Sequence, residues 1–594
     1  MLLKDTSKDY CRILFDILLK KGVQDVVLSP GSRNAPLLLA AECRPFRKQV
    51  ITDERTAAFV ACGLSLCSHQ PVALVCTSGT ALYDYAPAIA EAYYQHIPLI
   101  VITADRPMEW IDQDDSQTLH QPGALDKITK FSIDIPVQNS SRPEERWYVN
   151  RIINEAVNEA LSGRPGPVHI NVRLDNPLNE TIEVFEEELI EENCRIVDYI
   201  DNLDLPPHVY KELSQELAGK RIMITAGFMQ PDDKLNRAVA SMAKLPNVVC
   251  FCETISNLHL TGNPYNIDTV LSTLNAVDSR TMAALRPDVV ISIGGSLVSR
   301  KLKEFLRKYS PAEHWTLGDT SPTSDCFMAL TRHIEVSPDK FFKGIAKNLN
   351  KAVKFCNPLF KATWKERRRL AEISSARFLT NNTEWSELKA FSYMLSDLPS
   401  TFNLFLSNGT TVRYAQLFTK NIPHSSFACR GVSGIDGTTA VATGCAMAYA
   451  GRTLLITGDM SMAYDTGVLA LRNIPDKFKI IVINNSGGGI FRFIPTTREL
   501  EAREKLFCAA PNLPLRQLAE AYGWKYASAS SFEELEENYL PFLASKQKGV
   551  MEIFVDGEIS ADTLLRFMNR TPTPSPLPPE MISETNNWKQ IIDN

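Results

Sequence analysis

Short apolar runs alternate with helical segments along almost the whole chain, and this alternation limits the possible folds more than any other property of the sequence. The runs are rich in Val, Ile and Leu, and each ends in a small or polar residue. They are DVVLSP (25–30), PVALVCTSG (71–79), PLIVITAD (98–105), RIMITAG (221–227), DVVISIGG (288–295), FNLFLSNG (402–409), LLITGD (454–459) and KIIVIN (479–484). Strands that are apolar on both faces are typical of parallel sheets with helices on both sides. The sequence therefore predicts an α/β fold of doubly wound parallel sheets, which bind ligands at the carboxyl ends of their strands.

Two stretches interrupt this alternation. Residues 176–206 are acidic and punctuated by proline, as is typical of a linker, and residues 345–385 are charged with a helical pattern. The C-terminal segment TPTPSPLPPEM is too rich in proline to form a packed element. The sequence therefore predicts three α/β domains at 1–185, 195–350 and 381–570, a helical linker at 351–380 and a Pro-rich tail at 571–594.

Charge and cysteine content disfavour several classes of protein. The chain has 594 residues and a net charge of −6, without the basic patch that is typical of nucleic-acid binding. Its 13 cysteines are scattered and form no CxxC pairs, which favours free thiols in a reducing compartment. The charged N-terminal segment 1–22 has the pattern of an amphipathic helix and not that of a secretion signal. Since no apolar run approaches the ~20 residues of a membrane-spanning helix, we expect a cytoplasmic protein.

Two polar residues in the third predicted domain follow consecutive apolar runs. Asp459 comes directly after LLITG, and Asn485 comes after KIIVIN and before a glycine-rich turn. Parallel strands joined by a helix end at the same edge of a sheet, so this carboxylate and this amide can converge with a backbone carbonyl. Such an all-oxygen set suits Mg²⁺, which completes its coordination with phosphate oxygens and water. Free N–H groups at 458–461, where a helix begins, can hold those phosphates.

The same stretch resembles a known cofactor motif. Spacing alone also permits a helix cap at Asp459 and a simple turn at Asn485, and the lack of GxxxxGK[ST] disfavours a P-loop. However, GD followed by 25 residues and then N, between two strands, resembles the motif of thiamine diphosphate enzymes. The resemblance implies thiamine diphosphate as the cofactor and Mg²⁺ (or Mn²⁺) as the metal. It implies Asp459, Asn485 and the Gly487 carbonyl as metal ligands, with Gly458, Met460 and Ser461 also at the cofactor.

Glu54 is the candidate for activating this cofactor. It opens an Ala-rich helix after a strand that we expect to end at Asp53. Thiamine chemistry needs a carboxyl group hydrogen-bonded to the aminopyrimidine ring, and burial in an apolar pocket raises the pKa of a glutamate toward the operating range. The alternative is a first-turn glutamate that only interacts favourably with the helix dipole. In the family the glutamate and the metal motif come from two subunits, so the resemblance implies a homodimer or a homotetramer.

Further motifs narrow the resemblance to one branch of this family. SPGSR, DER, TSGTA, ADRP, the loop around Gln117, RGVSGIDG and GD…NN…GGGIF occur in this order over nearly the full chain. Together they resemble the transferases of menaquinone biosynthesis that decarboxylate 2-oxoglutarate and add the resulting fragment to isochorismate. The resemblance implies a pyrimidine-binding first domain, a central domain and a diphosphate-binding third domain.

The resemblance assigns the remaining site residues in three groups. The first group, on the isochorismate side, is Ser32, Arg33, Arg106 and Gln117. The second group, for substrate carboxylates, is Arg300, Lys301, Arg413 and Arg430. The third group, around the cofactor, is Asn408, Gly409, Thr410, Ile435 and Ile490, and Phe491 lines the pocket beside Ile490. The predicted catalytic residues are Glu54, Arg33, Gln117, Arg413 and Arg430.

Simpler alternatives exist for these assignments. An arginine at any one of these positions can be a surface ion-pair partner, worth about 0–1 kcal/mol. A different thiamine-dependent decarboxylase or carboligase, similar to acetolactate synthase, would act on smaller and less anionic substrates, so an arginine-rich pocket argues against it. A silent α/β binding or regulatory protein could retain the fold without activity, but the presence of Glu54, Asp459 and Asn485 argues against that interpretation.

Overall fold

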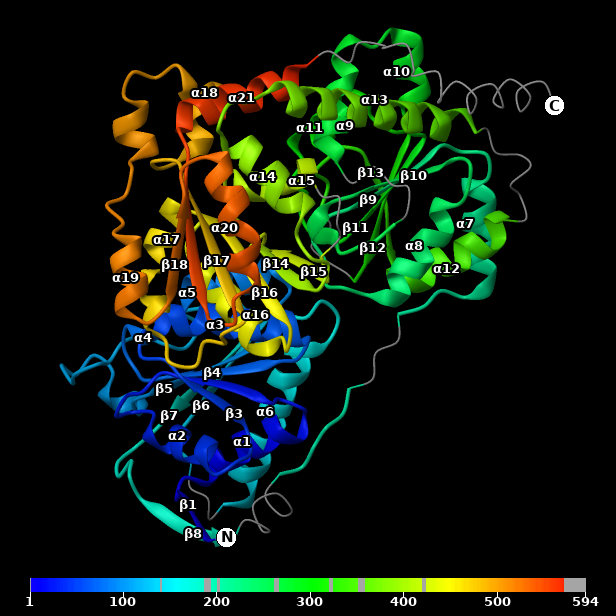
Figure 1. Cartoon of the computed structure of the whole chain (residues 1–594). Helices are drawn as coiled ribbons and strands as arrows, with labels where there is room; N and C mark the ends of the chain where they lie inside the picture. Colours follow the sequence, from blue (N-terminus) through cyan, green and yellow to red (C-terminus); the bar gives the residue numbers. More distant parts are fainter. Residues whose placement is uncertain are drawn as a thin grey trace.

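Three parallel β-sheets organise the chain, and Figure 1 shows them in blue, green and yellow to orange. The computed structural model describes residues 2–138, 142–185, 194–199, 203–260, 266–319, 324–350, 358–418 and 423–570. The predicted tail at 571–594 and residues 351–357 of the predicted linker lie outside these ranges. In the first sheet, Val27 and Leu74 face one apolar cluster while Val26 and Val75 face another, so both sheet faces are covered. The predicted fold class, α/β with doubly wound parallel sheets, is confirmed.

The first sheet has the strand order β3-β2-β4-β5-β7-β6, and all its pairs are parallel. Its strands are β2 (Asp25–Leu28), β3 (Arg47–Val50), β4 (Val72–Cys76), β5 (Leu99–Asp105), β6 (Phe131–Ile135) and β7 (Val168–Arg173). The helices of this part are α1 (Asp9–Lys20), α2 (Ala35–Glu42), α3 (Glu54–Ser68), α4 (Ala81–Asp84), α5 (Ala86–Gln95), η1 (Met108–Trp110) and α6 (Pro143–Leu161).

The central sheet has the order β10-β9-β11-β12-β13 and is also parallel. Its strands are β9 (Ile222–Ala226), β10 (Val248–Cys252), β11 (Val289–Ile293), β12 (Glu313–Gly318) and β13 (Leu330–Glu335). Its helices are α7 (Pro207–Leu217), α8 (Asp233–Ala243), η3 (Thr254–Ser256), α9 (Ile267–Ser272), η4 (Thr273–Ala276), α10 (Ser279–Leu285), α11 (Arg300–Lys308) and α12 (Pro338–Leu349).

The third sheet has the order β15-β14-β16-β17-β19-β18, again with parallel pairs only. Its strands are β14 (Phe402–Leu406), β15 (Ser425–Ala428), β16 (Arg452–Gly458), β17 (Phe478–Asn484), β18 (Lys525–Ala529) and β19 (Gly549–Phe554). Its helices are α14 (Glu387–Ser396), α15 (Thr411–Phe418), α16 (Thr438–Ala448), α17 (Asp459–Tyr464), η6 (Thr466–Ala470), η7 (Gly489–Arg492), α18 (Pro495–Arg498), η8 (Glu504–Cys508), α19 (Leu515–Ala521), α20 (Phe532–Ala544) and α21 (Gly557–Asn569).

The N-terminal segment differs from the expectation of one amphipathic helix. Helix α1 forms as expected, but the residues before it form strand β1 (Leu2–Thr6), which pairs antiparallel with β8 (Thr181–Phe185). Strand β8 lies in the stretch that we interpreted as a linker. Local periodicity did not indicate this pair, because each strand is held by a partner distant in sequence. Strand β3 likewise ends at Val50 and not at Asp53, since its pairing partner β2 ends at Leu28.

Helices α3 and α16 join the first sheet to the third and lie between them in Figure 1. They approach closely because Gly63 and Gly444 face each other, and a Cβ atom on either would collide with the backbone of the other helix. The Cys445 thiol donates to the Gly63 carbonyl at 3.3 Å. One apolar cluster therefore runs without a break from the first sheet to the third.

Helix α13 (Leu359–Asn381) connects the central domain to the third and runs along the top of Figure 1. Trp364 packs on Phe251 of the central sheet, with 4.9 Å between ring centroids. Phe378, further along α13, packs on Phe567 of α21 at 5.4 Å. Within the described ranges, no helix is both long and apolar enough to cross a membrane.

Candidate active site

Asp459 lies where β16 and β17 end side by side. The two strands pair in parallel, with Gly458 opposite Ile483, so Asp459 comes next to the turn that follows β17. Its carboxylate is 2% exposed and accepts hydrogen bonds from the backbone N–H groups of Gly487 (2.7 Å) and Met460 (2.8 Å). Burial raises the pKa of Asp459 to about 6, and these two bonds and Arg492 oppose the rise. Asp459 therefore ties the end of β16 to the neighbouring turn.

Asn485 turns toward the same buried region. It is 5% exposed, and its Nδ2 donates to the Glu387 carboxylate. Its Oδ1 is buried and has no hydrogen-bond partner among the described residues. The Gly487 carbonyl accepts one bond, from Gly489 N–H at 2.9 Å, and a carbonyl has a second lone pair. An unpartnered amide oxygen beside a carboxylate and a carbonyl fits the oxygen donors that Mg²⁺ prefers.

A buried arginine holds the turn after β17. Arg492 donates to the carbonyl oxygens of Asn485 (2.8 Å) and Ser486 (2.9 Å) and pairs with Glu504 at 2.7 Å. The bond from Arg492 lowers the pKa of Glu504 to about 2. At Gly487 the φ angle is +111°, which favours glycine, and a Cβ atom would collide with the Cys508 backbone. The Arg492 side chain and the close approach of the Cys508 backbone thus hold this turn in place.

The loop 429–437 gathers several of the predicted cofactor residues. Asn408 donates through Nδ2 to the carbonyls of Cys429 and Gly434, both at 2.6 Å, and its Oδ1 accepts from Arg430 at 2.8 Å. Ser461 of α17 donates to the Ile435 carbonyl, which links this loop to Asp459. The side chain of Asn408 is therefore fully engaged in holding the loop.

The other predicted cofactor residues lie beside these. Gly409 adopts a φ of +86°, and Thr410 follows it directly before α15. Ile490 and Phe491 lie in η7, next to the metal-ligand candidates, and the Phe491 ring packs on Phe507 with 5.7 Å between centroids. All the residues predicted around the diphosphate thus come from strand ends, loops and helix starts at one edge of the third sheet.

Two guanidinium groups lie near this loop: Arg430 is buried and Arg413 is partly buried. Burial lowers the pKa of Arg413, and the positive charge of Arg430 lowers it further, while Asp268 acts in the opposite direction. Burial also lowers the pKa of Arg430, opposed by Glu253 and Glu91. The Arg413 guanidinium donates to the Gly409 carbonyl. Adjacent cations with little exposure to solvent attract anionic ligands such as carboxylates.

The central domain contributes one of its two predicted cations to this group. Burial raises the pKa of Asp268, and Lys301, in the first turn of α11, lies close enough to oppose this rise. Arg300 points elsewhere, because its side chain is 79% exposed and pairs with Glu304 at 2.7 Å. Arg430 also forms part of the wall of a cleft of about 870 Å³ between the central sheet and the loop 426–431.

The four residues predicted on the isochorismate side come together in the first domain. Arg33 is buried and donates to the Leu174 carbonyl at 3.0 Å, and both burial and the nearby Arg106 lower its pKa. Arg106 donates to the Ser116 carbonyl and pairs with Asp115 at 2.9 Å. Gln117 has a φ of +57° and lies over Gly79. Ser32 is exposed in the loop beside Arg33.

Glu54 begins α3, as predicted, and is half-buried. Burial raises the pKa of its carboxyl group, and Asp84 and Asp53 raise it further. Its carboxylate forms no hydrogen bond or ion pair with any other residue that the structure describes, and its own backbone N–H opposes the rise in pKa. The neighbouring Arg55 instead reaches the third domain, where it donates to the Tyr464 carbonyl at 2.6 Å and pairs with Asp465 at 3.3 Å.

The structure therefore brings the predicted residues together in two groups. One group belongs to the first domain and the other to the third domain with Lys301 of the central domain. Over the described ranges, no hydrogen bond or ion pair joins Glu54 to the group around Asp459.

Several charged residues of the site were not predicted. Glu253 directly follows the apolar run of β10, so the rule of a polar residue after a strand could have identified it. It is buried and accepts from the N–H groups of Val298 (2.9 Å) and Ser299 (2.8 Å) at the start of α11. The others, Glu387, Arg492, Asp465 and Asp268, carry no comparable signal, because the sequence does not indicate which charged residues are buried.

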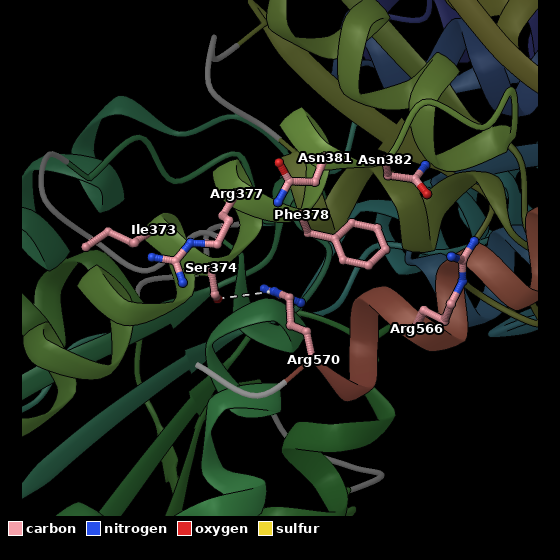
Figure 2. A pocket seen from close by; sticks show the side chains of 8 residues that line it. All are labelled: Ile373, Ser374, Arg377, Phe378, Asn381, Asn382, Arg566 and Arg570. Carbon is pink, nitrogen blue, oxygen red and sulfur yellow. Dashed lines mark hydrogen bonds between the residues drawn. The ribbon is translucent and has the colours of Figure 1, made fainter. Parts of the chain in front are cut away.

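A second hollow lies outside this site. Figure 2 shows a pocket of about 320 Å³ between α13 and α21, where Arg570 donates to Ser374 at 3.2 Å. Its lining is Ile373, Ser374, Arg377, Phe378, Asn381, Asn382, Arg566 and Arg570. None of the predicted site residues belongs to it.

Comparison with known proteins identifies the class to which this fold and site belong. Residues 9–124 match the family described as the N-terminal TPP binding domain of thiamine pyrophosphate enzymes, and residues 408–553 match the C-terminal TPP binding domain of the same enzymes. The first match contains Glu54, and the second contains Asp459 and Asn485. The protein is therefore an enzyme of the thiamine pyrophosphate class, and the predicted cofactor, thiamine diphosphate, is confirmed.

Curated relatives define the particular family. A 2-succinyl-5-enolpyruvyl-6-hydroxy-3-cyclohexene-1-carboxylate synthase from Porphyromonas gingivalis is 41% identical over 554 residues, which cover 92% of this chain and 94% of the relative. Proteins of the same name from Flavobacterium psychrophilum and Bacteroides thetaiotaomicron are 36% and 34% identical, covering 93% and 91% of this chain and 97% and 95% of their own lengths. The chain belongs to the family of 2-succinyl-5-enolpyruvyl-6-hydroxy-3-cyclohexene-1-carboxylate synthases.

Proposed function

We propose that this enzyme decarboxylates 2-oxoglutarate and adds the resulting fragment to isochorismate by 1,4-addition. The products would be CO₂ and 2-succinyl-5-enolpyruvyl-6-hydroxy-3-cyclohexene-1-carboxylate, in menaquinone biosynthesis. The observation that carries this proposal is the pair of neighbouring guanidinium groups, the partly buried Arg413 and the buried Arg430, beside the loop that also carries Ile435. Both proposed substrates are rich in carboxylates, and two adjacent cations with little exposure to solvent suit such ligands.

The third domain would hold the metal and the cofactor. Asp459, Asn485 and the Gly487 carbonyl are the proposed ligands of Mg²⁺ (or Mn²⁺), and the unpartnered Oδ1 of Asn485 supports this choice. The backbone N–H groups at 458–461 would bind the diphosphate, because α17 begins there. When bound, thiamine diphosphate supplies a nucleophilic carbon for the 2-oxo acid and accepts the electrons released as CO₂ leaves.

Glu54 of one copy would serve the cofactor bound by the third domain of another copy. Its half-buried carboxyl group, with a raised pKa and no partner in the described part of its own chain, is suited to donate or accept one proton. A homodimer, or a homotetramer built from such dimers, would place one glutamate at each cofactor. The first-domain group of Ser32, Arg33, Arg106 and Gln117 would then position isochorismate across the same cleft.

The arginines would act through charge. Arg413 and Arg430 would bind the carboxylates of the 2-oxo acid and stabilise negative charge as it moves during the reaction. Lys301, near Asp268, would approach the distal carboxylate, and Arg300 would join it by leaving its exposed pair with Glu304. Arg413 donates to the Gly409 carbonyl and Arg430 to the Asn408 amide oxygen, and neither forms an ion pair with a carboxylate among the described residues, so both could pair with an anionic substrate.

We also propose a cytoplasmic location and the domain limits 1–185, 195–350 and 381–570 with a helical linker at 351–380. The free thiols of the described cysteines support a reducing compartment. The long helix α13, which lies between the central and third sheets, supports the limits of the linker.

Incubation with thiamine diphosphate, Mg²⁺, 2-oxoglutarate and isochorismate, followed by mass analysis of the product, tests the proposal. We expect the named product and CO₂, and no product when any single component is omitted. Release of CO₂ from pyruvate in preference to 2-oxoglutarate would instead support an enzyme similar to acetolactate synthase and would contradict the proposed substrates.

A further inference from the structure

Glu387 is a buried carboxylate to which the proposed function gives no role. It begins α14, is 2% exposed, and its backbone N–H donates to the Ser560 hydroxyl of α21 at 3.1 Å. Its side chain enters the region where the turn after β17 meets the start of α15. There Oε1 accepts the hydrogen bond from Asn485 Nδ2. Glu387 therefore contacts a proposed metal ligand directly.

The surroundings of Glu387 do not neutralise its charge. Its Oε2 makes no hydrogen bond of good geometry to the described residues. Burial raises the pKa of Glu387, and the bond from Asn485 and the nearby Thr410 hydroxyl oppose this rise. Asp459 is a second carboxylate nearby, and Arg492 is the closest compensating cation. A buried carboxylate without an ion pair opposes folding.

The chemistry of a carboxylate determines how the Asn485 amide is turned. An ionised carboxylate can only accept hydrogen bonds, so the amide must present its NH₂ group to Glu387. The Oδ1 atom is then turned away from Glu387 and left free, which matches its lack of any partner among the described residues. The shapes of the two ends of an amide are nearly equal, so without such a neighbour the NH₂ group could face the cation instead.

We propose that Glu387 is a positioning residue of the metal site and that it holds the Asn485 amide with Oδ1 toward the cation. The inference rests on the proposed metal ligands. Partners that orient a metal ligand from outside usually contribute 10–100-fold to metal affinity. We therefore expect a loss of at least about tenfold in the apparent affinity for Mg²⁺ when this partner is removed.

Calorimetric titration of thiamine diphosphate at a series of Mg²⁺ concentrations tests the proposal without turnover. Glu387→Leu removes the acceptor and should shift the Mg²⁺ dependence by about tenfold or more. Glu387→Gln retains a carbonyl acceptor for the Asn485 NH₂ group and should shift it only a few-fold. Equal losses in both variants would show that charge, and not orientation, is what matters, and would overturn the proposal.

Asn485→Asp provides a second and independent comparison. A carboxylate at position 485 presents oxygen on both sides, so it needs no orientation, and it would face the Glu387 carboxylate with repulsion. In the Asn485→Asp background, Glu387→Gln should therefore strengthen Mg²⁺ binding, whereas in the wild-type background it weakens it slightly. This reversal of sign measures the coupling between the two positions and requires only isosteric changes. The same direction of change in both backgrounds would overturn the proposal.

Two controls separate this inference from its alternatives. Thermal unfolding without metal and cofactor should give Glu387→Leu a melting temperature no lower than that of wild type, because a buried carboxylate is removed. A lower melting temperature with an unchanged Mg²⁺ dependence would indicate a purely structural role. If wild-type protein itself bound thiamine diphosphate independently of Mg²⁺, the proposed metal site would fail. Unchanged Mg²⁺ dependence in the variants alone would refute only the role of Glu387.

Discussion

The first and third sheets have the same strand order, yet their carboxyl edges carry different chemistry. In both, the second strand along the chain lies outside the first, and the last two strands exchange places. In the first sheet a half-buried glutamate, Glu54, follows the outer strand β3 and has no partner within the described part of its chain. In the third sheet, Asp459 and Asn485 follow β16 and β17, are fully buried and are tied to the backbone and to Glu387.

This difference teaches that the topology determines where a ligand can bind but not what the site can do. In the proposed function, the same edge would be an anion and metal anchor where tight glycine turns bury oxygen atoms. It would be a place for a proton-transferring group where a helix begins with a half-buried carboxylate. Two equivalent sheets that present complementary edges are suited to enclose one cofactor between two copies of the chain.

The largest expected effect concerns Asp459, which lies at the carboxyl edge of the third sheet. Asp459→Ala removes the only charged ligand among the proposed metal ligands, so thiamine diphosphate affinity should fall by more than the roughly 100-fold upper range for outer partners. The loss should shrink when Mg²⁺ is omitted, because the metal then contributes to neither protein. Calorimetry with and without Mg²⁺ measures both quantities. An unchanged affinity for thiamine diphosphate would show that Asp459 does not help to bind the cofactor. The proposed difference between the carboxyl edges of the first and third sheets would then be wrong.

A substitution of Glu54, at the carboxyl edge of the first sheet, should change kcat and not the affinity for the cofactor. Glu54→Gln retains the size of the side chain but cannot hold or release the proton, so kcat should fall at least about 100-fold. Cofactor affinity measured by calorimetry should remain near that of wild type. Near-normal turnover would refute the assignment of Glu54.

Mixing the Glu54→Gln and Asp459→Ala variants tests whether each active site is formed by two copies of the chain. If each site combines Glu54 of one copy with Asp459 of another, a mixed dimer contains one fully intact site. Random pairing makes half of the dimers mixed, so activity should return to roughly a quarter of wild type. Denaturing and refolding Glu54→Gln together with Asp459→Ala allows exchange, and each variant refolded alone serves as the control. No recovery would indicate a site within a single chain.

The smallest expected effect concerns the contact that joins the two domains within one chain. Asp465 accepts from the N–H groups of Gly437 (3.0 Å) and Thr439 (2.9 Å) and pairs with Arg55. Burial raises its pKa to about 6, so the folded protein binds this proton more tightly than the unfolded chain. The stability that protonation provides is therefore complete below pH ~4 and is lost as the pH rises through about 6.

Asp465→Asn isolates this contribution. Because the amide does not titrate, the variant should gain stability relative to wild type between about pH 4.5 and about pH 7, by about 2–3 kcal/mol at most. Urea denaturation at the two pH values measures the difference in the free energy of unfolding between Asp465→Asn and wild type. A constant difference would show that Asp465 does not titrate in this range.

The fold could be predicted from the sequence where the interactions are local or repeated. Each apolar run forms a strand, because burial on both faces requires Val, Ile and Leu at every position, and Glu54 begins a helix as predicted. The pairing of β1 with β8 was not predicted, since it depends on two segments that meet only in the folded chain. For the same reason, neither Glu387 nor Arg492 carried a signal, although both contact Asn485.

By itself the sequence determined the three-sheet α/β class and the family, and it indicated which polar residues follow the strands, because hydrophobic periodicity and motif order are properties of the chain alone. Only the tertiary structure decided which of these residues come together. It divided them into two groups, turned Arg300 toward solvent with Glu304, and placed a buried carboxylate behind Asn485. The physical reason is that burial and charge depend on neighbours distant in sequence. A glutamate can therefore be half-buried without a partner residue at the start of one helix, as Glu54 is, and be the buried partner of a metal-ligand candidate at the start of another, as Glu387 is.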